Sequence, residues 1–191
     1  MIVTKRIAIF SSGPGTNAEN IIRYFQANKK AVVEMVLCNN LDAGVIKRTE
    51  KLQIPCILFT KEDFYKSEKI ESLLKEKKIE LIVLAGFLWL LPQKLIETFP
   101  NKIINIHHAL LPKHGGKGYY GMNVHRAVLK AGEKTSGITI HYVNENFDEG
   151  RIIAQYECAI KENDTPESLA AKIHQLEYEY YPKVIEQLLE K

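Results

Sequence analysis

The sequence predicts an α/β protein with a doubly wound, mostly parallel Rossmann-like sheet, an antiparallel C-terminal end and helices on both faces. Short apolar runs alternate with amphipathic helical segments over the first two thirds of the chain, which is the pattern of βαβ units. A glycine-containing loop joins the first run to the first helix, as is common in this class of sheet. Near the C-terminus, strand-like segments at 136–143 and 151–159 are separated only by a turn, which favours an antiparallel pair.

The apolar runs of the first half are continuous rather than alternating, so they predict strands that are buried on both faces. These runs lie at 6–10, 31–38 and 80–85, and the last of them is the strongest candidate for a central strand. A brief further strand is expected at 54–58. Helical spacing of apolar residues predicts a helix after residue 17, a short helix around 45–52 and a longer one over 61–78.

The second half opens with an apolar strand that ends at His107, followed by a helix over 122–130. The segment 136–143 alternates apolar and polar residues, which indicates a half-exposed strand. Thr165 is a predicted N-cap for the last helix, with Pro166 at the first helical position and Ser168 at the capping-box position. That helix is predicted to run to about residue 189 and to break at Pro182.

Composition narrows the class of protein. The 191 residues are 46% hydrophobic and 26% charged, which suits one soluble globular domain with a developed core. A net charge of +3 is too small to indicate a nucleic-acid or membrane-surface partner. The opening MIVTKRIAIF lacks a signal-peptide layout, and Cys38, Cys56 and Cys158 are expected to be buried, reduced thiols. We therefore expect a cytoplasmic location.

Two connections have unusual compositions. The loop Gly13-Pro14-Gly15-Thr16-Asn17 would point backbone N–H groups outward at a helix N-terminus, where an anion is favoured, although such loops also serve as plain tight turns. Its spacing matches neither the dinucleotide fingerprint nor the Walker loop. The apolar, aromatic segment 86–92 is expected to be either a helix docked on the core or the wall of a pocket for a flat ring system.

Three polar residues are candidates for one catalytic site. Asn105 and His107 lie on the strand that ends at the ligand-binding edge of such a sheet, and Asp148 follows a later strand. An amide and a protonated imidazole can stabilise a developing oxyanion, and a carboxylate can orient the imidazole or pass on a proton. In the simpler alternative, Asn105 holds neighbouring backbone and Asp148 caps its own turn. Histidines are frequent in this region, but no His, Cys or carboxylate spacing matches a known cage, so no metal is predicted.

Two stretches resemble a known family. NIHHALLPKHGGKGYYG is similar to the Asn-Ile-His-Pro-Ser-Leu-Leu-Pro signature of formyltransferases that use 10-formyltetrahydrofolate, and SGITIHYVNENFDEGRIIAQ resembles the segment that carries their catalytic aspartate. The resemblance implies transfer of the formyl group of 10-formyltetrahydrofolate to the amine of glycinamide ribonucleotide in de novo purine (IMP) biosynthesis. It also implies direct attack through a tetrahedral intermediate, without a metal.

The resemblance also assigns roles to residues. Asn105 and His107 would polarise the formyl carbonyl, Asp148 would assist His107 and proton transfer, and His141 would support them. The residues implied for the substrate phosphate and ribose are Gly13, Pro14, Gly15, Thr16, Asn17 and Glu177. The residues implied for the folate are Phe87, Leu88, Trp89, Leu90, Asn105, Val143, Asn144 and Phe147.

These roles divide a single formyltransferase domain, 1–191, into a phosphate- and nucleotide-binding half, 1–100, and a catalytic and folate-binding half, 101–191. The implied partners are small molecules, with no nucleic acid and no membrane, and the protein is expected to be a monomer or homodimer. Departures from the family pattern are His108-Ala109 in place of Pro-Ser, Trp89 in place of an arginine, and a longer glycine-rich loop at 115–121. The alternatives are a formyltransferase acting on a nucleotide-linked amino sugar or methionyl-tRNA, and a catalytically silent ligand-binding homologue.

Overall fold

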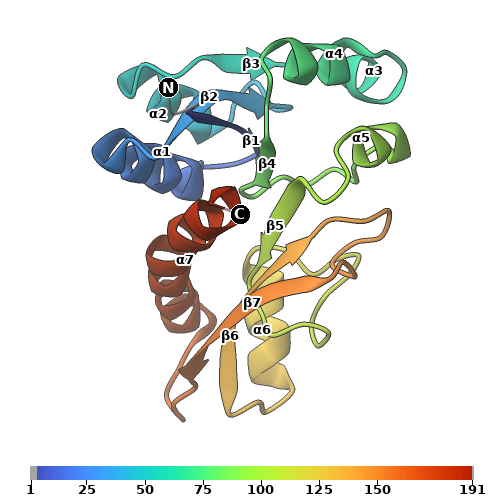
Figure 1. Cartoon of the computed structure of the whole chain (residues 1–191). Coiled ribbons are helices and arrows are strands. Elements are labelled where there is room, and N and C mark those ends of the chain that lie inside the picture. Colours follow the sequence, from blue (N-terminus) through green and yellow to red (C-terminus); the bar gives the residue numbers. More distant parts are fainter. Residues whose placement is uncertain (1–3, 191) are drawn as a thin grey trace.

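A computed structural model describes residues 4–190, which form a seven-stranded sheet with the order β3-β2-β1-β4-β5-β6-β7 (Figure 1). The first five strands pair in parallel, whereas β5 with β6 and β6 with β7 pair antiparallel. The predicted fold class is confirmed. The strands are β1 (Lys5–Ser11), β2 (Ala31–Cys38), β3 (Cys56–Leu58), β4 (Leu81–Leu84), β5 (Ile103–His107), β6 (Thr135–Tyr142) and β7 (Ile152–Ala159).

Helices cover both faces of the sheet because the central strands are apolar on both sides. In β1, Ile7 and Ile9 pack into one core cluster, and Ala8 and Phe10 pack into the other. The first cluster includes residues of α1 (Thr16–Asn28), α2 (Gly44–Lys51), α6 (Met122–Lys130) and α7 (Pro166–Leu189). The second includes residues of α3 (Lys61–Tyr65), α4 (Lys69–Glu76) and α5 (Gln93–Thr98). Within residues 4–190, no helix has the length and apolarity needed to cross a membrane.

The helix predicted over 61–78 is wrong, because α3 and α4 are separate helices. The Oγ of Ser67 donates to the carbonyl oxygen of Asp63 at 2.9 Å and accepts from the N–H of Lys69 at 3.3 Å. Such side-chain bonds compete with the helical hydrogen-bond ladder and allow the chain to turn between the two helices.

The prediction of a half-exposed strand at 136–143 is also wrong, because β6 is buried from Ser136 to His141. Its polar side chains face other protein groups rather than water. The hydroxyl of Thr139 donates to the carbonyl oxygen of Ala109 at 2.7 Å and accepts from the N–H of Leu111 at 3.0 Å. The alternating polar residues of β6 therefore belong to a buried hydrogen-bond network that holds the loop after β5, and they do not face solvent.

The last helix begins as predicted, with a reciprocal capping box between Thr165 and Ser168. The predicted break at Pro182 is wrong, since α7 continues through it to Leu189. Proline cannot donate to the carbonyl four residues earlier, that of Tyr178. The side-chain amide of Asn20 in α1 donates to this carbonyl at 2.9 Å instead. A tertiary contact thus supplies the hydrogen bond that proline removes.

The three cysteines are free, but only Cys38 is buried. Cys56 and Cys158 are half-buried, contrary to expectation, because they lie on β3 and β7, the two edge strands of the sheet. Apolar neighbours in sequence do not reveal which strand is at an edge.

Candidate active site

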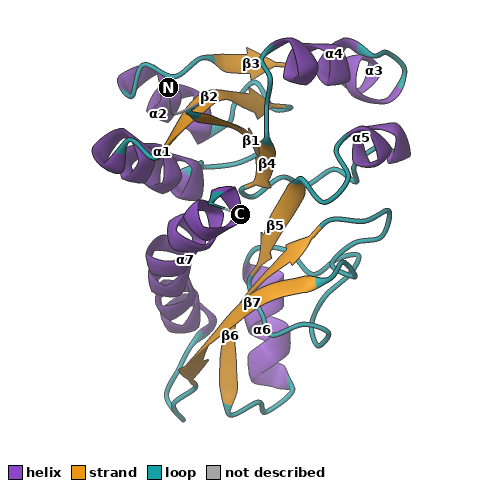
Figure 2. Cartoon of the chain, viewed as in Figure 1, coloured by secondary structure: helices purple, strands orange, loops and turns teal. Residues whose placement is uncertain are grey.

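Asn105, His107 and Asp148 meet at the carboxyl end of β5. The Nδ2 atom of Asn105 lies 3.4 Å from Oδ1 of Asp148, and Nδ1 of His107 lies 3.4 Å from Oδ2 of the same carboxylate. Figure 2 shows how the long loop after β5 and the loop between β6 and β7, which carries Asp148, approach one another at this edge of the sheet. The structure therefore brings together the three residues that the sequence singled out.

The tautomer of His107 follows from its neighbours. Its Nε2 atom lies 2.7 Å from the carbonyl oxygen of His114, and a carbonyl can only accept, so Nε2 carries the proton. Nδ1 is then the nitrogen that faces Asp148. Burial lowers the pKa of His107 below its ordinary value, although Asp148 and the His114 carbonyl oppose this effect. At neutral pH the ring is neutral, with its Nδ1 lone pair directed at the carboxylate side of the site.

Asp148 is held in an uncommon backbone conformation, with φ 58°. Left-handed conformations of residues other than glycine tend to occur where function requires a fixed geometry. The N–H of Gly116 donates to Oδ2 of Asp148 at 3.0 Å. Burial raises the pKa of Asp148, but His141, His107 and the Gly116 N–H outweigh it, so the net pKa is lowered and the carboxylate is ionised at neutral pH.

His141 lies on β6 next to Asn105 and completes the cluster. Its Nδ1 atom is 2.9 Å from the carbonyl oxygen of Tyr142, so Nδ1 carries the proton. Its Nε2 atom is 3.3 Å from the Asn105 amide nitrogen and 3.6 Å from Oδ1 of Asp148. Nε2 therefore faces both the Asn105 amide and the Asp148 carboxylate, and these contacts orient the Asn105 side chain.

The loop between β1 and α1 turns tightly at Gly15 into the N-terminus of a helix. Gly15 has φ 78°, and a Cβ there would lie 2.5 Å from the Cβ of Val45, so only glycine fits. Thr16 and Asn17 then begin α1, a helix whose free N–H groups favour negative charge. Arg48, which sequence reasoning missed, donates from Nε to the carbonyl oxygen of Pro14 at 2.8 Å and also pairs with Glu19.

Glu177 of α7 is fully buried between two histidines. Its Oε2 atom lies 2.8 Å from Nδ1 of His174, and its Oε1 atom lies 3.6 Å from Nε2 of His108. Burial raises the pKa of Glu177, but His108, His174 and Asn17, at the start of α1, bring the net value below the ordinary one. His108 therefore belongs to this second cluster and not to the Asn105 cluster. His174 was missed, although its position three residues before Glu177 on a helix was an available signal.

The segment 86–92 is not a helix. Phe87 and Trp89 turn inward and pack against an aromatic group that includes Phe64, with ring centroids 5.6 and 5.9 Å from it. Leu88 and Leu90 alternate with them and are 55% and 37% exposed, so these two are the side chains available to a ligand. Among the other residues implied for the folate, Val143 and Asn144 are half-buried and Phe147 is exposed. Within residues 4–190, no group of three or more His, Cys, Asp or Glu side chains has the geometry of a metal site.

Comparison with known proteins decides the family. The formyl transferase family model matches residues 5–185. The chain belongs to the formyl transferase family. Phosphoribosylglycinamide formyltransferase of Bacillus subtilis is 39% identical to this formyl transferase. The alignment covers 97% of the present chain and 95% of that relative. The chloroplastic enzyme of that name from Arabidopsis thaliana is 37% identical over 98% of the chain, which spans only 66% of that relative's length.

Solved structures agree with this assignment. The crystal structure of phosphoribosylglycinamide formyltransferase from Bacillus halodurans superposes with a TM-score of 0.87 at 37% identity. The alignment covers 98% of this formyl transferase and 96% of that chain, so the sheet order and the helices around it are shared along almost the whole molecule.

Proposed function

We propose that this formyl transferase moves the formyl group of 10-formyltetrahydrofolate to the amine of glycinamide ribonucleotide, a step of de novo purine biosynthesis. The observation that carries the proposal is the convergence of Asn105, His107 and Asp148 within 3.4 Å contacts at the edge of the sheet that also holds the phosphate loop. Relatives named phosphoribosylglycinamide formyltransferase support the choice of substrate.

The chemistry follows from the protonation states. When the substrate amine attacks the formyl carbon, negative charge develops on the formyl oxygen and the amine becomes acidic. Neutral His107 can take the amine proton at Nδ1, and Asp148 then stabilises the imidazolium. The proton can afterwards go to the folate nitrogen that leaves. The Asn105 amide contacts are long, 3.3 and 3.4 Å, so its protons are available to the stronger acceptor that an oxyanion provides.

Substrate binding would use both halves of the chain. The backbone N–H groups at Gly13, Gly15 and the start of α1 suit the phosphate, and Glu177 suits hydrogen bonds from ribose hydroxyls. The exposed apolar side chains Leu88, Leu90 and Phe147 fit the flat folate ring, as one expects of an apolar binding wall. Phe87 and Trp89 would support that wall from behind. We retain 1–100 as the phosphate- and nucleotide-binding half and 101–191 as the catalytic and folate-binding half of one domain, with two exceptions. The wall at Leu88 and Leu90 comes from the first half, and Glu177 comes from the second.

The remaining features of the proposal are a metal-free reaction, small-molecule partners, a cytoplasmic location and a monomer or homodimer. Size-exclusion chromatography with light scattering distinguishes the two oligomeric states.

The direct test supplies purified protein with 10-formyltetrahydrofolate and glycinamide ribonucleotide and follows loss of the formyl group from the folate. Turnover supports the proposal. Turnover only with a nucleotide-linked amino sugar or methionyl-tRNA would contradict the choice of substrate. Binding of both substrates without turnover would identify a catalytically silent homologue.

A further inference from the structure

One short loop segment holds both members of the His107–Asp148 pair. The carbonyl oxygen of His114 accepts from Nε2 of His107, and the N–H of Gly116 donates to Oδ2 of Asp148. Between them, Gly115 packs so closely that an added Cβ would lie 3.3 Å from the Cβ of Asp148. The segment lies in a loop, 108–121, that contains only turns and bends, so regular secondary structure does not fix its position.

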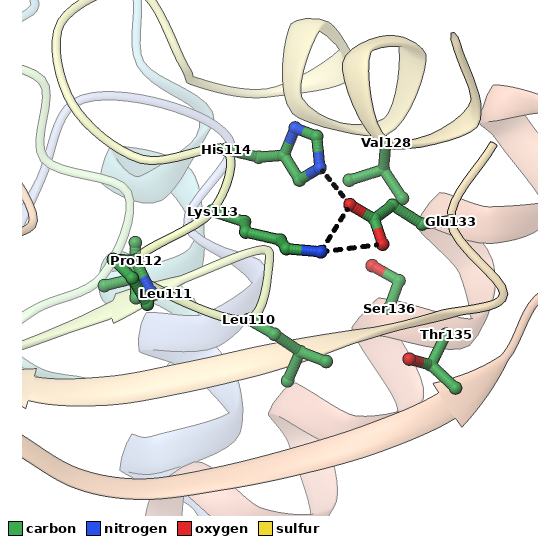
Figure 3. A pocket seen from close by; sticks show the side chains of 9 residues that line it. All are labelled: Leu110, Leu111, Pro112, Lys113, His114, Val128, Glu133, Thr135 and Ser136. Atoms are coloured by element: carbon green, nitrogen blue, oxygen red, sulfur yellow. Dashed lines mark hydrogen bonds and ion pairs between the residues drawn. The ribbon is translucent and has the colours of Figure 1, made fainter. Parts of the chain in front are cut away.

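Glu133, in the turn between α6 and β6, fastens this segment from outside the active site. Its Oε1 atom lies 3.3 Å from Nε2 of His114, and its two oxygens lie 3.1 and 3.2 Å from Nζ of Lys113. Figure 3 shows the carboxylate between these two side chains, in a pocket of about 260 Å³ that Ser136 also lines.

We propose that Glu133 is a positioning residue for His107, because by holding His114 it fixes which ring nitrogen of His107 carries the proton. The catalytic consequence rests on the proposed formyl transfer, but the effect on the imidazole does not. A neutral imidazole has two tautomers, and the one present is set by the hydrogen bond that its other nitrogen makes. Here that bond ends on the backbone of His114, so a shift of His114 weakens the bond that favours the Nε2–H tautomer.

Two observations explain why His114 needs an external contact. Its backbone is left-handed, with φ 55°, a conformation that persists only where surrounding contacts maintain it. Its side chain is only 15% exposed and that of Glu133 is 25% exposed, whereas Lys113 is 68% exposed. The His114 contact is therefore the one through which Glu133 acts, because exposed ion pairs contribute little. Lys113 and His114 both lower the pKa of Glu133, which keeps the carboxylate ionised.

The test compares Glu133→Ala and Glu133→Gln with a matched control, Glu162→Gln, at an exposed position in the turn before α7. Ring ¹⁵N chemical shifts of His107, assigned with a His107→Gln variant, report the tautomer without any substrate. We expect the Nε2–H tautomer in the wild type and in Glu162→Gln, and a mixture of tautomers in Glu133→Ala. Glu133→Gln keeps an acceptor for His114 and should restore most of the wild-type signature.

In turnover assays we expect Glu133→Ala to lower kcat about tenfold with little change in KM, because a small misplacement of a catalytic group is costly. The double variant Glu133→Ala/His114→Ala should be no worse than the single variants if both act through one contact. Unchanged His107 shifts in folded Glu133→Ala would overturn the proposal. A double variant whose loss of kcat equals the combined losses of the two single variants would also overturn it. Absence of wild-type turnover would refute the proposed function but leave the tautomer result intact.

Discussion

The imidazole Nδ1 of His107 lies 3.4 Å from the carboxylate Oδ2 of Asp148, although one residue ends a parallel strand and the other lies in the loop of an antiparallel pair. Because Nε2 of His107 is engaged by the His114 carbonyl, this contact involves the one ring nitrogen that can exchange a proton. The pair therefore joins a neutral base to an ionised carboxylate that can stabilise its protonated form.

Removing either member of this pair should abolish most of the activity. We expect Asp148→Asn and His107→Ala each to lower kcat by more than about a hundredfold, the usual cost of losing a general acid–base group or an oxyanion donor. Glu157→Gln, at an exposed position on β7, is the control for a change of carboxylate to amide. Formyl transfer from 10-formyltetrahydrofolate measures the effect, and circular dichroism checks the fold. Near-normal turnover in either variant would remove that residue from the mechanism.

Glu177 should affect substrate affinity more than the chemical step. Glu177→Gln removes the charge that His108 and His174 face, and it weakens a carboxylate acceptor for ribose hydroxyls. We expect KM for glycinamide ribonucleotide to rise about tenfold or more, as for loss of a charge-assisted hydrogen bond, with a smaller change in kcat. Glu167→Gln, exposed in the first turn of the same helix, is the matched control. An unchanged KM would place the ribose elsewhere.

Local patterns predicted most of the fold. Continuous apolar runs located the buried strands, and the start of α7 was readable because the Thr165–Ser168 capping box involves only neighbouring residues. The candidate pair Asn105 and His107 was readable because polar side chains are unusual on an otherwise apolar strand. Asp148 was a candidate because it follows a later strand, and the resemblance to a family strengthened its assignment to the same site.

Tertiary contacts explain what the sequence could not predict. Pro182 by itself predicts a helix break, but Asn20 of α1 donates to the carbonyl of Tyr178 that the proline leaves free. The sequence pattern predicts that Thr139 faces solvent, but the loop after β5 covers it and bonds to its hydroxyl. Arg48 and Glu133 carry no local signal, because ordinary surface charges become informative only when their partners are known.

The contact between Asn20 and Tyr178 predicts that substitutions of Asn20 and Pro182 have coupled effects on stability. Asn20→Ala should lower the free energy of unfolding by about 1 kcal/mol, the typical net value of one such hydrogen bond. In a Pro182→Ala background the helix can make its own bond to the Tyr178 carbonyl, so Asn20→Ala should cost less there. Urea unfolding of the four proteins gives the coupling energy. Equal costs in both backgrounds would show that Asn20 does not compensate for the proline.

His125 of α6 should make the protein acid-sensitive. It is 2% exposed, and its pKa is lowered from 6.5 to about 4, mainly by burial, with smaller contributions from His108, His174 and His107 and with Glu177 opposing them. Between pH 6.5 and about 4, the unfolded chain therefore binds a proton at His125 that the folded chain does not. Stability must fall as pH falls through this window, by up to about 3 kcal/mol.

Comparison with His125→Asn isolates this contribution, because other groups titrate in the same window. The lowered pKa of Glu177 also costs stability in acid, whereas the raised pKa of His174 acts in the opposite direction. Urea unfolding at a series of pH values from 7 to about 4 gives both stability curves. We expect the wild type to lose more stability than the variant as the pH falls, because the variant has no proton to gain at this position. Parallel curves would mean that His125 is protonated as readily in the folded protein as in the unfolded chain.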